Sequence, residues 1–250
     1  SSARLVAMNS TSLAGRTVVL TRPLQQSIQL ERELIALGAH VVQMPLIAIA
    51  RPHDKGEALQ ASLAHLQQFD WVVVTSANGA AQVAGALSQM SVRPKLAAVG
   101  KATADALGVQ VDFVPTIARG DELVAQFPQG SGRVLLAQAQ DVDGAVADGL
   151  RARGYVVDAV AAYSTEAVAP SNDDMELALR ADAVVFYSGS AVRSWCAAFG
   201  ATSPKAVIAI GKPTEAVAHA SALRNVAVAS EPTTDAVVAA LRGLFQQPNP

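Results

Sequence analysis

The stretch Trp71-Val-Val-Val-Thr-Ser-Ala-Asn-Gly79 joins a run of β-branched residues to a turn of small polar residues. The valine run favours a buried strand. Ser76 and Asn78 are residue types that cap helices, and the apolar residues that follow are spaced as on one helical face. The pattern therefore predicts a strand that leads through a polar turn into a helix. Backbone N–H groups at such a helix start favour a carboxylate or phosphate.

The same design returns later in the chain, at Ala183-Val-Val-Phe-Tyr-Ser-Gly-Ser190. Other segments also recur in the same order, and the pairs are 17–21 with 133–137, 72–78 with 184–190, 98–103 with 209–214, and 115–121 with 230–235. Strands and helices are expected to alternate throughout, with a further strand at 109–114. This repeat predicts an α/β fold of two similar units, each a parallel sheet flanked by helices. Ligands of such sheets bind beyond the carboxyl ends of the strands.

Composition limits the classes of function. The chain has 250 residues, 51% of them hydrophobic, and a net charge of -2, which offers no basic footprint for nucleic acid or an anionic membrane. No apolar run is long enough to suggest a membrane span, and the N-terminus lacks the order of a signal peptide, so we expect a cytoplasmic protein. The single cysteine, Cys196, fits a reducing compartment and is expected to be a buried helix residue.

The usual catalytic and cofactor motifs are missing. There is no Gly-x-Gly-x-x-Gly after a strand, no Gly-x-Ser-x-Gly, and the Gly-Lys pairs at 100–101 and 211–212 are followed by Ala and Pro. The four histidines lack ligand spacing, so we expect no metal and no cofactor. What remains is a set of polar groups at strand-to-helix junctions. Each alone is more often a helix cap than a ligand contact, but together they would line a cleft between two domains; they are Ser76, Asn78, Thr103, Ser188, Ser190 and Thr214.

Seven segments have an order and spacing that match a known family. They are Leu20-Thr-Arg-Pro23, Val74-Thr-Ser-Ala-Asn-Gly79, Ala98-Val-Gly-Lys-Ala-Thr103, Tyr163, Tyr187-Ser-Gly-Ser190, Ala209-Ile-Gly-Lys-Pro-Thr214 and Pro232-Thr-Thr234. Together they make the chain resemble uroporphyrinogen-III synthase from about Gly15 to Leu244. The turn at 187–190 departs from the family, because many relatives have a Phe-Thr-Ser-Pro-Ser type of turn there.

The resemblance implies a domain arrangement that the repeat alone does not. The repeat would divide the chain near Gly130, whereas the family pairs the first strand-helix segment with the last part of the chain. We therefore expect a discontinuous domain of residues 15–38 plus 169–246 and an inserted domain of residues 51–154. Residues 39–50 and 155–168 would form a two-stranded bridge that lets the domains open and close. Residues 1–14 and 247–250 would be flexible tails.

The resemblance also implies a reaction. The family is a cyclising hydro-lyase that converts hydroxymethylbilane, with loss of water and inversion of the terminal pyrrole ring D, into uroporphyrinogen III for haem, sirohaem and cobalamin biosynthesis. The pyrrole itself expels the hydroxyl, so the protein mainly holds the linear substrate in position as a monomer, without metal or cofactor. The alternative is a non-catalytic two-domain protein that binds a small anion.

The residues that would perform these roles follow from the matched motifs. Tyr163 either assists hydroxyl departure as a general acid or hydrogen-bond donor, or packs as a structural tyrosine in the bridge. Arg22 would pair with a substrate carboxylate or simply close the end of the first strand. Lys101 and Lys212 lie near the turns but are expected to be solvated. The other expected substrate contacts are Ser76, Asn78, Gly79, Thr103, Ser188, Ser190, Gly211 and Thr214.

Overall fold

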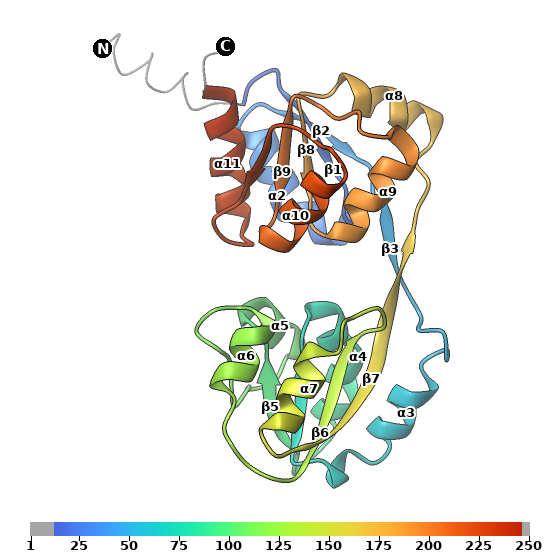
Figure 1. Ribbon diagram of the computed structural model, residues 1–250, viewed down its shortest axis with the longest axis vertical. Coiled ribbons are helices and arrows are strands. Elements are labelled where there is room, and N and C mark those ends of the chain that lie inside the picture. The colour runs from blue at the N-terminus through green and yellow to red at the C-terminus, as the bar shows by residue number, and fades with distance from the viewer. Residues whose placement is uncertain (1–12, 247–250) are drawn as a thin grey trace, which may run out of the picture. The chain divides into compact units, whose positions relative to one another are not determined.

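The computed structural model describes residues 13–246, which form two compact units (Figure 1). One unit combines the chain up to Ala48 with the chain from Glu166 onward, and the other unit runs from Ile49 to Thr165. The chain passes from one unit to the other within strand β3 (Ile47–Ala50) and returns within strand β7 (Val156–Ala167). The first unit is therefore built from two separate stretches of sequence.

The first unit is a parallel five-stranded sheet with helices on both faces (Figure 1). In spatial order its strands are β10 (Val226–Val228), β9 (Ala206–Ala209), β8 (Ala183–Phe186), β1 (Thr17–Leu20) and β2 (His40–Gln43). Its helices are α2 (Leu24–Ala36), α8 (Asn172–Arg180), α9 (Gly189–Phe199), α10 (Lys212–Ala220) and α11 (Thr234–Gln246).

Alternation along the central strands explains why both faces of this sheet are covered. Val18 and Leu20 join the core cluster that includes α2 and α11, whereas Val19 joins the cluster that includes α8, α9 and α10. Side chains on both faces are thus removed from water, which requires a continuous apolar run rather than an alternating one. Trp195 of α9 is fully buried in the second cluster, where its Nε1 donates to the Thr202 carbonyl at 2.8 Å.

The second unit has a sheet of the same kind. Its strand order is β3, β7, β6 (Arg133–Ala139), β4 (Trp71–Val74) and β5 (Lys95–Ala98), with β7, β6, β4 and β5 parallel. Helices α3 (Glu57–Leu63), α4 (Ala77–Ser88) and α5 (Lys101–Leu107) contribute to the core of one face. Helices α6 (Gly120–Gln126) and α7 (Ala145–Ala152) contribute to the other, and a short 3-10 helix, η1 (Leu66–Gln68), precedes β4.

The internal repeat is present in the strand order of the two sheets. The order β2, β1, β8, β9 in the first unit corresponds to β7, β6, β4, β5 in the second. The strand expected at 109–114 is wrong, because only Phe113 forms a parallel bridge, to Ala97, in the position that β10 occupies beside β9. Here the Asp112 carboxylate accepts the Leu96 N–H at 2.7 Å, so a side chain takes the place of a strand carbonyl.

The stretch expected as one connection, residues 39–50, divides into two strands. His40–Gln43 is β2, the edge strand beside β1, and Ile47–Ala50 is β3, which is hydrogen-bonded to β7. Helix α4 begins at Ala77, directly after its N-cap residue Ser76. Of the expected tails 1–14 and 247–250, residues 1–12 and 247–250 lie outside the described residues. The expectation is wrong for Leu13, which is buried in the core of the first unit and whose N–H donates to the Leu37 carbonyl at 2.9 Å.

Candidate functional site

Arg22 is a partly buried charged residue at the carboxyl edge of the first sheet. It lies two residues after the end of β1, and its Cζ lies 4.0 Å from the centroid of the ring of Tyr187, the residue after β8. Its Nε is buried and has no hydrogen-bond partner among the described residues. Burial lowers the pKa of Arg22, an effect that Tyr187 partly opposes, but a guanidinium stays charged at any physiological pH. A half-buried cation without a carboxylate partner favours an anionic ligand.

Tyr187 supplies an aromatic surface for this cation rather than a counter-charge. Burial raises the pKa of its phenol, and the neighbouring Arg22 lowers it in part, so the hydroxyl stays neutral. The contact is a cation–π interaction, which stabilises the guanidinium without neutralising it. Arg22 therefore keeps its capacity to bind a carboxylate.

Gln43, which the sequence analysis missed, is the last residue of β2, the strand that pairs with β1. The register places Gln43 opposite Leu20, so its side chain shares the sheet face of Leu20 and Tyr187. Both polar atoms of its carboxamide are buried and have no partner among the described residues. A polar residue directly after the valine pair of this strand was the available signal in the sequence.

The serine turns have a clear structural role. Ser188 Oγ accepts the Ala191 N–H at 3.2 Å as the N-cap of α9 and lies 2.9 Å from Ser190 Oγ. Ser76 Oγ accepts the Gly79 N–H at 3.1 Å as the N-cap of α4. Each serine thus satisfies one of the helix-end N–H groups that a ligand would otherwise bind. A direct substrate contact from Ser76, Ser188 or Ser190 stays a prediction.

Gly79 and Asn78 lie in the first turn of α4. A Cβ at Gly79 would lie 3.2 Å from the Ala137 carbonyl oxygen, so the glycine lets the helix approach β6 closely. This packing accounts for the glycine without any ligand. Asn78 has an interaction within the protein and is partnered.

The two threonines occupy equivalent positions in the two units. Thr103 lies in the first turn of α5 and Thr214 in the first turn of α10, and each is only 5% exposed. The N-cap residues of these helices are glycines, Gly100 and Gly211, which provide no capping side chain. The lysine of each turn forms an ion pair with a carboxylate of its own helix: Lys101 with Asp105 at 2.8 Å, and Lys212 with Glu215 at 2.9 Å. The lysines are exposed, as the sequence predicted.

Tyr163 lies in β7, beside an irregularity in the pairing of β7 with β6. The register shifts between Gln138 and Ala139, so Ala162 has no partner and both Ala162 and Tyr163 join the same core cluster. Tyr163 is 8% exposed and lines a cavity of about 550 Å³ in the second unit. Arg51 and Lys55 line the same cavity, and the sequence analysis assigned no role to either.

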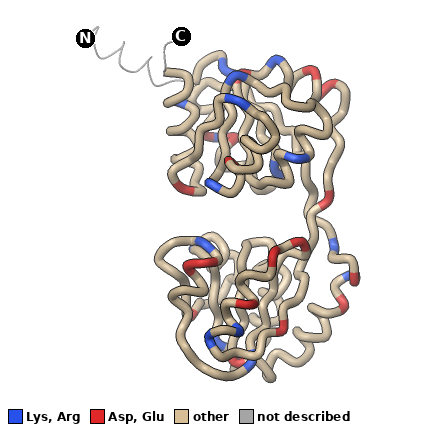
Figure 2. Tube along the Cα trace, viewed as in Figure 1, with Lys and Arg blue, Asp and Glu red and all other residues tan. Residues whose placement is uncertain are grey.

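Along the backbone of each unit, Lys and Arg positions are interspersed with Asp and Glu positions (Figure 2). Among residues 13–246 no three acidic, histidine or cysteine side chains gather as a metal site. Within the same range no helix has the length and apolar character needed to cross a membrane.

Cys196 is half-buried in α9, and burial raises the pKa of its thiol, an effect that a Ser221 hydrogen bond partly opposes.

The protein thus has two α/β units, each built on a sheet of mainly parallel strands. Each unit carries side chains that are candidates for binding an anion. A sequence profile described as "Uroporphyrinogen-III synthase HemD" matches residues 28–239. The chain therefore belongs to the uroporphyrinogen-III synthase family.

Individual relatives agree with this assignment. Uroporphyrinogen-III synthase of Synechococcus elongatus is 31% identical over 198 residues, which cover 74% of this chain and 75% of the relative. A solved mutant uroporphyrinogen III synthase of Thermus thermophilus has a TM-score of 0.61 at 18% identity, covering 93% of this chain and 99% of that one. The Helicobacter pylori enzyme has a TM-score of 0.59 at 15% identity, covering 92% and 99%. The two structures establish a shared fold.

Proposed function

We propose that this protein cyclises hydroxymethylbilane to uroporphyrinogen III, with loss of water and inversion of pyrrole ring D. The observation that carries the proposal is the family match over residues 28–239. The unpaired guanidinium of Arg22 supports it, because the linear substrate carries many carboxylates and needs cationic or N–H donors to hold it.

The chemistry requires positioning more than strong acid or base catalysis. The electron-rich pyrrole that bears the hydroxymethyl group expels the hydroxyl, which leaves as water after taking up a proton. The resulting cation is attacked by the substituted carbon of ring D to give a spiro intermediate. The bond between that ring-D carbon and its methylene bridge to the neighbouring ring then breaks, the methylene carbon bonds to the other α-carbon of ring D, and loss of the proton from that carbon yields the inverted macrocycle. Holding these carbons in register is the protein's main contribution.

Tyr163 is the proposed proton or hydrogen-bond donor to the departing hydroxyl. It lines a cavity, and none of the described residues hydrogen-bonds to its hydroxyl, so this donor is available to a ligand. Thr103 and Thr214 are the proposed hydroxyl contacts to substrate carboxylates, together with Gly211 and the serine turns. No electrons are exchanged in the reaction, so no redox cofactor is required.

We also propose that the protein works as a monomer in the cytoplasm. A single half-buried cysteine fits a reducing compartment. Size-exclusion chromatography with light scattering measures the molar mass in solution and so tests whether the protein is a monomer.

The test of function is an isomer analysis of the product. Freshly generated hydroxymethylbilane is supplied to the protein, and the oxidised products are separated into type I and type III uroporphyrin. Predominant type III is expected from the wild-type protein. Only type I, at the rate seen without protein and from a folded sample, would refute the enzyme and leave an anion-binding protein.

Tyr163→Phe then tests the proposed donor. It is expected to lower kcat by about 10²-fold, as for loss of a general acid, with KM little changed. Tyr155→Phe is the matched control, because this buried tyrosine donates only to the Pro128 carbonyl, at 3.3 Å. A Tyr163→Phe protein with wild-type kcat would assign Tyr163 a packing role.

A further inference from the structure

A cavity in the second unit combines positive charge with an apolar wall. Its volume is about 550 Å³, within the range of about 300–1,000 Å³ typical of small-molecule sites. Apolar side chains from β3, α3 and β7 form part of the wall. The polar residues that line it are Arg51, Lys55, Gln60, Gln82 and Tyr163. The lining contains two cations and no carboxylate.

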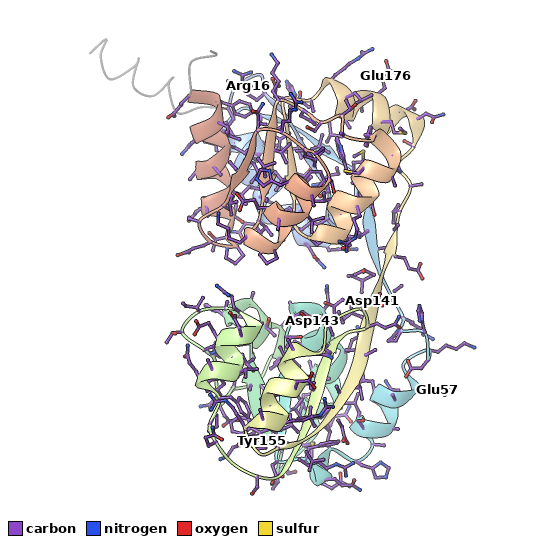
Figure 3. The ribbon with its side chains drawn as sticks, viewed as in Figure 1. Arg16, Glu57, Asp141, Asp143, Tyr155 and Glu176 are labelled. Carbon is purple, nitrogen blue, oxygen red and sulfur yellow. The ribbon has the colours of Figure 1, made fainter. Side chains whose placement is uncertain are left out.

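Neither cation of this cavity is neutralised by the described part of the chain. Arg51 and Lys55 form no ion pair there, although Asp54 and Glu57 are close in sequence. Asp54 is already engaged, because its carboxylate accepts the N–H groups of Gly56 and Ala58 at 2.9 and 3.0 Å. Glu57 is exposed at the start of α3 (Figure 3). The lining of the cavity therefore carries two cations that no carboxylate of the described residues contacts within ion-pair distance.

The loop that carries these cations is anchored. Ser164 Oγ donates to the Arg51 carbonyl at 2.6 Å, and Gln140 Oε1 accepts the His53 N–H at 2.6 Å. These bonds tie the loop to β7 and to the residue that follows β6. Arg51 is thus attached to the strand that carries Tyr163.

Lys55 has a backbone conformation that its residue type disfavours. Its φ is +59° and that of Gly56 is +87°, and the Glu57 N–H bonds to the Asp54 carbonyl at 3.1 Å. Two positive φ angles at the centre of such a turn characterise type I′, for which Asn-Gly is the favoured pair. A lysine in this position keeps a local strain, and strained residues cluster at functional sites.

We propose that this cavity is a carboxylate subsite that receives one acetate- and propionate-bearing pyrrole ring of the substrate, beside Tyr163. The inference rests on the proposed function. Arg51 suits a bidentate contact with one carboxylate and Lys55 a point-charge contact with the other. Gln60 and Gln82 add amide donors, and the apolar wall suits the ring. The subsite would place a substrate ring next to the proposed donor.

Lys55→Asn separates binding from stability, because the two effects should have opposite signs. Asparagine suits the turn, so the thermal midpoint should rise slightly, while loss of the ammonium should weaken substrate binding. We expect KM for hydroxymethylbilane to rise about tenfold, with kcat within about twofold of wild type. Calorimetric titration with uroporphyrinogen III under argon should show a similar loss of affinity. Arg51→Gln should act in the same direction.

Lys205→Asn is the matched control, because Lys205 is exposed, belongs to the other unit and forms no ion pair among the described residues. Its KM and affinity should equal those of wild type. Wild-type KM and affinity in both Lys55→Asn and Arg51→Gln would overturn the subsite. If wild-type protein makes no type III isomer, the proposed reaction fails, whereas Lys55-dependent binding of uroporphyrinogen III in that sample would still support a carboxylate site.

Discussion

Arg22→Met removes a positive charge from the carboxyl edge of the first sheet while keeping an unbranched side chain. The substitution distinguishes a ligand-binding arginine from a structural one. A structural arginine would have hydrogen bonds or an ion pair to lose, but Arg22 has only its contact with the Tyr187 ring. We therefore expect the folded state to tolerate the change and ligand binding to fail.

The magnitude follows from opposing terms in the free energy of unfolding. Losing a partly desolvated cation–π contact costs about 1–2 kcal/mol. Removing a buried Nε–H without a partner relieves about 1–3 kcal/mol of desolvation. The net change should therefore lie between about 1 kcal/mol of destabilisation and about 2 kcal/mol of stabilisation, so the thermal midpoint should fall by no more than about 4 °C.

Ligand binding should respond much more strongly. A hydrogen bond to a charged group contributes about 1.5–3 kcal/mol. At about 1.4 kcal/mol for each factor of ten, Arg22→Met should weaken uroporphyrinogen III binding by about tenfold to 150-fold. Calorimetric titration under argon measures this loss, and thermal unfolding of the ligand-free protein measures stability.

The control is Arg32→Met, because Arg32 is exposed on α2 and forms no ion pair among the described residues. It should change neither affinity nor midpoint. A stability loss above about 2 kcal/mol in Arg22→Met, together with unchanged affinity, would refute the reasoning, because it would mean that the guanidinium supports the fold.

Two further predictions concern stability. Ser188→Ala removes the N-cap of α9 and should lower the free energy of unfolding by about 1 kcal/mol in urea titration, whereas an unchanged value would mean that water replaces the cap. Gly132→Ala should destabilise the second unit by about 3 kcal/mol or more, because φ is +117° and a Cβ would lie 2.3 Å from Asp70 Oδ2, whose oxygen accepts the Arg133 N–H. A thermal midpoint equal to that of wild type would contradict this clash.

Local patterns were sufficient to predict most strands and helices. Strand and helix periodicities depend on neighbouring residues, and the valine run at 72–74 is fully apolar because both sheet faces are covered. The expected strand at 109–114 failed because Asp112 replaces a strand carbonyl with its carboxylate, which also accepts a bond from Arg93 at 3.1 Å. No local pattern distinguishes such a side-chain bond from a strand pair.

The sequence was sufficient to recognise the motif residues, but it did not predict which residues surround them in the fold. Ser76 and Ser188 were recognised as capping types, and the structure shows each accepting an N–H from the residue three positions later. The register shift that turns both Ala162 and Tyr163 inward depends on pairing with β6, a strand that begins at Arg133. Such pairing is a long-range property that residue spacing does not encode.

The sequence by itself determined the repeated α/β pattern, the family resemblance and the polar turns, because these depend on residue type and order. Only the tertiary structure decided which charges lack partners. Arg22 stacks on Tyr187 from a strand more than 150 residues away in sequence, and Lys55 shares a cavity with Tyr163. Whether a cation is neutralised depends on what folding brings within a few ångströms of it, and that is set by packing across the whole unit.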